Sequence, residues 1–145
     1  MSNARAPGLP SEPAGNAPMA ARAIVAGHGD FAAGLISAVE AVTGRGEMLE
    51  PIQVKGLCGE DIQQLLRERL VATGAQVIFT DLQAGSCTMA ARRLLRDQPT
   101  VVLVSGTNLP MLLDFVMSSA PTPHDAAHAA VERARSAITA YGGPA

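Results

Sequence analysis

Aromatic side chains are scarce in this 145-residue sequence, which has three phenylalanines, one tyrosine and no tryptophan. Proteins that bind single-stranded nucleic acid use aromatic side chains as stacking platforms in a basic groove. Positive charge is also limited, because 11 lysines and arginines face 13 aspartates and glutamates, for a formal net charge of −2. This composition argues against binding to a phosphate backbone, and we expect no nucleic-acid partner.

Long apolar runs and cysteines are equally sparse. No apolar stretch approaches the length of about 20 residues that a membrane-spanning helix needs. The two cysteines, Cys58 and Cys87, are too few for a disulfide framework. Free thiols at this level are typical of a reducing compartment, so the sequence predicts a cytoplasmic protein.

The chain length predicts one domain, and an apolar content of 48% is enough for a sizeable aliphatic core. Residues 1–20 differ from the rest, because they contain four of the ten prolines and no apolar segment of the kind found in signal peptides. We interpret residues 1–20 as a disordered leader or a tag-derived segment. The domain is expected to span residues 21–141, followed by a flexible tail at 142–145.

Short apolar runs alternate with amphipathic segments along the domain. The runs predict strands at residues 22–27, 48–54, 76–80 and 100–105. Apolar residues at helical spacing predict helices at 31–42, 59–73, 89–95, 108–117 and 124–140. Pro51 places the second strand at a sheet edge, because proline donates no ladder hydrogen bond. Asp30 is expected to cap the first helix, and Gly74 to end the second.

Strands that alternate with helices and are apolar throughout indicate an α/β fold, with a doubly wound, mainly parallel sheet covered on both faces. Right-handed crossovers and the edge position of the second strand predict the order 2-1-3-4, which leaves room for an extra edge strand. Ligands bind such sheets beyond the carboxyl ends of the strands, where the order reverses. Here that place lies between the first and third strands.

The residues expected at this place share a chemistry. His28 and Gly29 follow the first strand, Asp81 follows the third, and Gly85 and Ser86 precede the next helix. A carboxylate beside a histidine fixes its tautomer and makes the other ring nitrogen the better nucleophile. Glycine amides and helix N-termini favour phosphate groups. The sequence therefore predicts an imidazole that carries a phosphoryl group, with no metal and no cofactor.

Three motifs at these strand ends resemble the mannose-family IIA domain of the bacterial phosphoenolpyruvate-dependent sugar phosphotransferase system. They read AIVAGHGDFAAGL at 23–35, VIFTDLQAGSCTMAA at 77–91 and VVLVSGTNLPMLLDFV at 101–116. The resemblance extends from about residue 22 to about residue 140. The residues at 28–31 and 106–109 are most similar to members specific for N-acetylgalactosamine or galactosamine, with mannose as the other candidate sugar.

The resemblance implies a role for each predicted site residue. His28 is expected to receive phosphate from the phosphocarrier protein HPr and to pass it to a IIB component, while Asp81 orients His28. Gly29, Gly85 and Ser86 are expected to contact the phosphoryl group. The resemblance also implies a homodimer, and a peripheral place beside the IIC and IID membrane permease. The family loop usually reads Gly-Gly-Ser/Thr-Pro, whereas this chain has Ala-Gly-Ser-Cys at 84–87.

Other functions stay open at this stage. The phosphoryl-donor subunit of a dihydroxyacetone kinase and a regulatory IIA domain are related alternatives. A small hydrolase that uses Ser86, His28 and Asp81 is a remote one, because the G-x-S-x-G motif is missing. A receiver module needs an acidic pair after the first strand, where this chain has Gly27 to Gly29.

Two further patterns have simpler explanations. His124 and His128 have the i, i+4 spacing of a metal-binding helix face, but the start of a solvated helix explains them better, because the sequence supplies no third strong ligand nearby. Cys87 and Arg93 match the C-x5-R spacing of cysteine phosphatases, although the residues between them favour a helix rather than a phosphate loop.

Overall fold

The computed structural model describes residues 22–144. The predicted leader at 1–20, the first residue of the predicted domain (21) and the last residue of the predicted tail (145) lie outside the described residues. A four-stranded parallel sheet forms its centre, with the strand order β2-β1-β3-β4. The strands are β1 (Ala23–Gly27), β2 (Leu49–Gln53), β3 (Val77–Thr80) and β4 (Val102–Val104). The predicted fold class and strand order are confirmed. Residues 22–144 form no additional edge strand.

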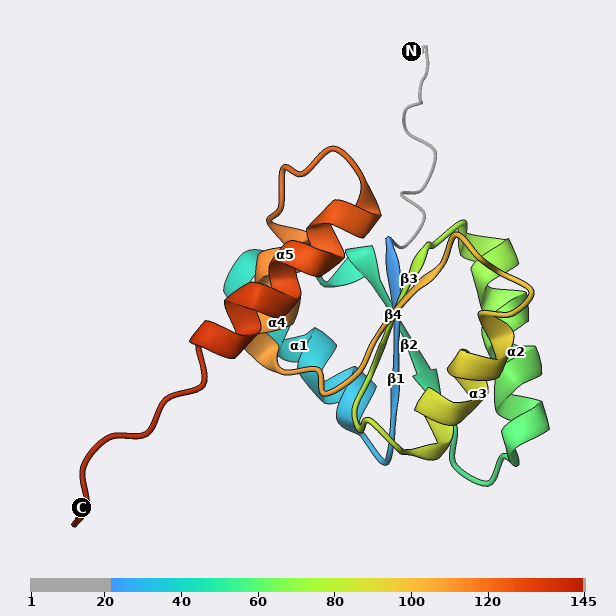
Figure 1. Ribbon diagram of the computed structural model, residues 1–145, viewed down its shortest axis with the longest axis horizontal. Coiled ribbons are helices and arrows are strands. Elements are labelled where there is room, and N and C mark those ends of the chain that lie inside the picture. The colour runs from blue at the N-terminus through green and yellow to red at the C-terminus, as the bar shows by residue number, and fades with distance from the viewer. Residues whose placement is uncertain (1–21, 145) are drawn as a thin grey trace.

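Helices cover both faces of this sheet. One face carries α1 (Phe31–Thr43), α4 (Leu109–Val116) and α5 (Pro123–Ser136), and the other carries α2 (Gly59–Thr73) and α3 (Ser86–Leu94) (Figure 1). A 3-10 turn, η1 (Gly46–Met48), leads into β2. None of the helices formed within residues 22–144 is long and apolar enough to span a membrane.

Two separate apolar cores result from the alternation of side chains along the strands. Val25 and Phe79 point to the face of α1, α4 and α5, whereas Ile24 and Ile78 point to the face of α2 and α3. All four side chains are fully buried. Phe79 packs edge to face against Phe115 of α4, with ring centroids 5.1 Å apart. The scarce aromatic residues therefore strengthen one of the two cores.

The sequence signals at the second strand and helix correspond to the structure. Pro51 lies in β2, which is an edge strand paired only with β1. The helix predicted at 59–73 has these bounds. It ends at Gly74, which adopts a left-handed conformation with φ of 74° and donates its N–H to the carbonyl of Leu70.

The last helix is shorter than predicted. The expected range was 124–140, but α5 ends at Ser136, and the side chain of Ile138 beyond it is 72% exposed. Helical spacing alone does not maintain a helix end, because most helical stability in proteins comes from burying an apolar face. Ile138 has the correct spacing but is not covered, so the helical pattern stops before it.

The strand register determines where the predicted site residues lie. Ala26 of β1 is paired with Thr80 of β3, so the residues that follow these two strands emerge side by side. His28 and Asp81 belong to these two loops. The central strand pair of the sheet thus brings together residues that are 53 positions apart in the sequence.

We predict that Leu66→Ala lowers the free energy of unfolding by about 2–5 kcal/mol, because Leu66 is fully buried between α2 and the sheet. Urea unfolding followed by circular dichroism measures this change. The matched control is Val71→Ala on the same helix, where the side chain is 78% exposed and a change within about 0.5 kcal/mol is expected. Equal losses in the two variants would contradict the assigned core.

Candidate functional site

His28 lies directly after β1, in the short loop that leads to α1. Its side chain is 57% exposed, so the ring is accessible from solvent. Gly29 follows with a φ of 53°, a left-handed conformation that glycine adopts without steric cost. The turn closes when the N–H of Phe31 donates to the carbonyl of His28 over 3.0 Å. The loop therefore holds the backbone of His28 while leaving its ring at the surface.

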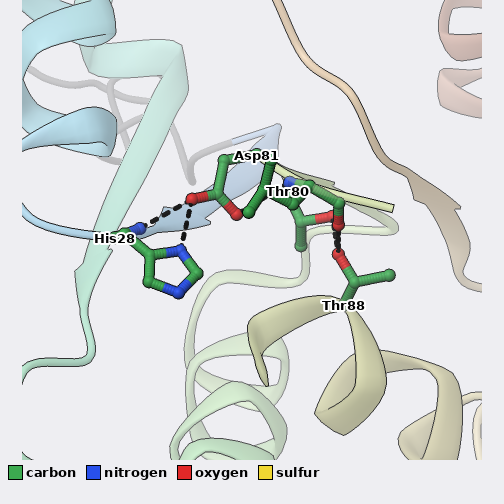
Figure 2. A network of polar contacts seen from close by, with 5 residues as sticks. His28, Thr80, Asp81 and Thr88 are labelled. Atoms are coloured by element: carbon green, nitrogen blue, oxygen red, sulfur yellow. Dashed lines mark hydrogen bonds and ion pairs between the residues drawn. The ribbon is translucent and has the colours of Figure 1, made fainter. Parts of the chain in front are cut away.

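Asp81 contacts both the backbone and the ring of His28 (Figure 2). Its Oδ2 atom accepts the backbone N–H of His28 at 2.8 Å and lies 2.7 Å from Nδ1 of the ring. Its Oδ1 atom accepts the backbone N–H of Leu82 at 2.8 Å. The Asp81 side chain is only 9% exposed, so its carboxylate is held from several sides beneath an accessible imidazole.

The charge of Asp81 decides which ring nitrogen carries the proton. Burial raises the pKa of this carboxyl, but the hydrogen bonds from His28 and Leu82 and the charge of His28 outweigh burial, so the pKa lies below its ordinary value. Asp81 is consequently ionised at neutral pH and only accepts hydrogen bonds. Nδ1 of His28 must then donate, and in the neutral ring Nε2 keeps its lone pair. Figure 2 shows this second nitrogen directed away from Asp81.

The loop after Asp81 brings Gly85 against the imidazole. A Cβ atom placed on Gly85 would lie 3.2 Å from Cε1 of His28, so the absence of a side chain leaves room for the ring. Ser86 begins α3 and is exposed. The repeating helical bonds of α3 start when Met89 N–H donates to the carbonyl of Gly85. The amides of the first turn before Met89 have no helical acceptor, which is the usual arrangement at an anion-binding helix start.

The start of α1 differs from the prediction. Asp30 precedes this helix, but its carboxylate makes no capping hydrogen bond within residues 22–144, and its φ of −92° and ψ of 18° are unlike those of a typical capping residue. The backbone N–H of Phe31, the first residue of α1, donates to the carbonyl of His28 instead. The expected side-chain cap is therefore wrong, because the tight turn through Gly29 satisfies that end of the helix from the backbone.

Gly27, one of the two glycines that flank His28, contributes to the site through contacts that the sequence did not indicate. A Cβ atom on this residue would lie 2.5 Å from Cδ2 of Phe31 and 3.0 Å from Cγ of Asp81. The first distance is shorter than real Cβ atoms show, and the second is unusually tight, so glycine lets the Phe31 ring and the Asp81 carboxyl approach the end of β1. A glycine directly before the strand-end histidine was the available signal.

Two buried threonines were also missed. The hydroxyls of Thr80 and Thr88 lie 2.6 Å apart, and Thr88 also contacts the backbone carbonyl of Leu82. Both residues flank the loop that carries Asp81. Their types alone gave no signal, since threonine is common both in strands and in the first turn of helices.

The two minor motifs do not assemble into sites. Cys87 is buried within α3, and burial, reinforced by the charge of Asp81, raises the pKa of its thiol to about 11. Arg93 donates to Gln63 of α2 rather than to the Cys87 region. His124 bonds through Nε2 to the carbonyl of Thr100, and residues 22–144 contain no cluster of three metal-ligating side chains.

Comparison with known structures gives consistent results. A phosphotransferase system component EIIA from Streptococcus agalactiae has a TM-score of 0.74 at 22% identity, covering 82% of this chain and 95% of that one. A mannose/sorbose-specific IIA subunit from Enterococcus faecalis has a TM-score of 0.71 at 20% identity, covering 88% and 98%. A candidate sugar phosphotransferase permease from Klebsiella pneumoniae has a TM-score of 0.69 at 29% identity, covering 85% and 92%.

No curated protein matches the sequence. The family model of the phosphotransferase system fructose IIA component, EIIA-man, matches residues 22–134, which is most of the chain. This match includes the loops that carry His28, Asp81 and Gly85. The chain therefore belongs to the mannose-family IIA components of the sugar phosphotransferase system.

Proposed function

We propose that this chain is a phosphoryl carrier whose His28 accepts a phosphoryl group from HPr and passes it to a IIB component. The observation that carries the proposal is the exposed imidazole, whose Nδ1 is bound to an ionised Asp81 and whose Nε2 has no hydrogen-bond partner among residues 22–144. An unprotonated ring nitrogen at the surface is the nucleophile that such a transfer needs. Two protein partners must reach the same atom in turn, and an open site suits both.

The transfer step uses the two nitrogens of His28 differently. Nε2 attacks phosphorus in line, the new N–P bond forms, and the bond between phosphorus and the HPr histidine breaks, with its electron pair returning to that histidine. Positive charge develops on the His28 ring, whose Nδ1–H remains bonded to Asp81. The carboxylate stabilises this charge, and transfer through a loose transition state needs mainly positioning and electrostatic support.

The phosphoryl oxygens carry negative charge and need hydrogen-bond donors. Gly29, Gly85 and Ser86 are the residues that we assign to this task. The amides at the start of α3 are without helical acceptors, and the exposed Ser86 hydroxyl lies beside them. Aligned amides at a helix start stabilise negative charge without a cation.

The family supplies the wider setting. We propose that the IIB component delivers the group to sugar at a IIC/IID permease, which places this chain in the cytoplasm and peripherally at the membrane. N-acetylgalactosamine, galactosamine and mannose are the candidate sugars. A homodimer is the expected assembly, and analytical ultracentrifugation of the purified chain distinguishes it from a monomer.

We predict that phosphoenolpyruvate, enzyme I and HPr together phosphorylate His28. The product should be labile in acid and stable in base, as expected for phosphate on an imidazole nitrogen, and mass spectrometry should place it on His28. His28→Ala should abolish labelling. His128→Ala is the matched control, because this exposed histidine lies on α5, and its labelling should equal that of the wild type.

If a competent HPr does not transfer its phosphoryl group to the intact chain, the proposal is wrong. The acceptor then separates the alternatives, since onward transfer to a IIB component supports transport, and transfer to a dihydroxyacetone kinase supports the donor-subunit alternative. Labelling without onward transfer supports a regulatory IIA domain. Ser86→Ala should retain phosphorylation of His28, whereas a Ser/His/Asp hydrolase would lose all activity with that change.

We predict that Asp81→Asn lowers the rate of His28 phosphorylation by about 100-fold or more. The asparagine amide has the same shape as the carboxylate but carries no charge. It can also donate a hydrogen bond, so it no longer requires Nδ1 of His28 to be the protonated nitrogen. Rapid-quench measurement with labelled HPr gives the rate. Asp97→Asn, at an exposed aspartate paired with Arg67, is the control and should leave the rate unchanged. Equal rates for wild type and Asp81→Asn would exclude this role.

Asp81 should also make stability depend on pH. Its folded-state pKa lies below the ordinary value of 3.8, so ionised Asp81 stabilises the fold above pH 3.8, and this contribution is lost as pH falls through the folded-state pKa. The stability difference between wild type and Asp81→Asn should therefore shrink on acidification. Urea unfolding of both proteins from neutral to acidic pH measures it. A constant difference would show that the carboxylate charge contributes nothing.

A further inference from the structure

Two buried hydroxyls, those of Thr80 and Thr88, are hydrogen-bonded to each other close to Asp81 (Figure 2). We refer to this arrangement as the hydroxyl chain. Oγ1 of Thr80, at the end of β3, is 2.6 Å from Oγ1 of Thr88 in the first turn of α3. The Thr88 hydroxyl also bonds to the carbonyl of Leu82. Thr80 is completely buried and Thr88 is 2% exposed, so water does not compete for these bonds.

The order of donors in this chain follows from the groups themselves. The Leu82 carbonyl only accepts, so Thr88 must give its single hydroxyl proton to that oxygen. The Thr88 oxygen then accepts the proton of Thr80. The other acceptor near Thr80 is the carbonyl of Val104 at 3.4 Å, a much longer contact. The hydroxyl chain therefore runs in one direction, from Thr80 through Thr88 to Leu82.

Leu82 connects this chain to the functional site. Its carbonyl binds Thr88, while its N–H donates to Oδ1 of Asp81 over 2.8 Å. Its side chain is 56% exposed, so packing does little to hold this residue. The backbone of Leu82 consequently depends on its hydrogen bonds for position. Through Leu82, a buried hydroxyl determines where the N–H that binds Asp81 is placed.

The remaining contacts within the loop are weak. The turn from Leu82 to Gly85 is closed by a backbone hydrogen bond of 3.5 Å, at the limit of the usual range. Residues 84–87 are Ala-Gly-Ser-Cys, so no proline restricts this part of the loop. Proline restricts a loop by fixing φ. The hydrogen bond from Thr88 of α3 to the carbonyl of Leu82 restricts the loop in a different way.

We propose that Thr88 is a positioning residue that holds Asp81, and through it His28, by fixing the backbone of Leu82. The inference rests on the proposed function only in that His28 is taken as the phosphoryl acceptor. Because Thr88 is buried, it acts on the geometry of the reacting group rather than on binding of HPr.

The test replaces Thr88 by valine, which keeps the branched shape and removes the hydroxyl. We expect kcat for phosphorylation of His28 by HPr to fall about tenfold, the effect of losing one hydrogen bond of about 1.4 kcal/mol, while KM for HPr is unchanged. Amide hydrogen exchange at Leu82 should accelerate about tenfold. The Asp81 carboxyl, followed by carbon NMR, should titrate closer to the ordinary value for aspartate. Thr88→Ser should restore all these quantities.

Two matched controls separate positioning from general loss of stability. Thr73→Val removes another buried hydroxyl with two hydrogen bonds, to the carbonyl of Arg69 and from the N–H of Ala75, at the far end of α2. It should lower stability but leave kcat unchanged. Thr107→Val removes a buried hydroxyl without a partner among residues 22–144, and should change neither.

The outcomes are distinct. Unchanged kcat and unchanged Leu82 exchange in Thr88→Val would overturn the inference, as would an equal loss of kcat in Thr73→Val. If Thr88→Val does not fold, Thr88→Ala removes the same hydroxyl, and unchanged exchange at Leu82 in that variant overturns the inference. If HPr fails to phosphorylate the wild type, the proposed function fails, whereas the exchange and titration of the unphosphorylated protein still decide the role of Thr88.

Discussion

The hydrogen bonds between Asp81 and His28 are the interactions on which the rest of the site depends. One carboxylate oxygen holds both the backbone and the ring of His28, which fixes the position and the tautomer of the imidazole together. A partly buried carboxylate is normally costly, because burial raises its pKa. Here, donated hydrogen bonds reverse that effect and keep the charge. The site thus contains one stable negative charge beneath one accessible nucleophile.

The sheet makes this pair possible. His28 and Asp81 follow adjacent parallel strands, and the pairing of Ala26 with Thr80 brings the two loops together. The cores on the two faces hold these strands from both sides. Loops at the carboxyl edge are then anchored by rigid elements while remaining open to solvent. The imidazole of His28 is therefore held in a fixed geometry and is also accessible at the surface.

Much of the fold could be predicted because its signals are local. Uniformly apolar runs indicated the parallel strands, Pro51 indicated the edge, and Gly74 marked the end of α2. Those same signals placed His28 and Asp81 at one edge of the sheet. The true end of α5 was not predictable from spacing, because it depends on whether a neighbouring element covers Ile138.

The support of the site was hidden for a related reason. Thr80, Thr88 and Gly27 are ordinary residues in their segments, and their importance arises from distances across the fold. Neither composition nor periodicity reports whether two hydroxyls meet or whether a missing Cβ makes room for a carboxyl. A histidine and an aspartate at strand ends have distinctive chemistry, whereas the residues that support them are recognised by geometry.

The backbone and the side chain of Leu82 have different environments. Its backbone is bound at both ends, to Asp81 and toward Thr88, while its side chain extends to the surface beside the imidazole. Most substitutions at this position would therefore alter the exposed surface next to Asp81 without removing these backbone bonds, whereas proline would remove the N–H that Asp81 accepts.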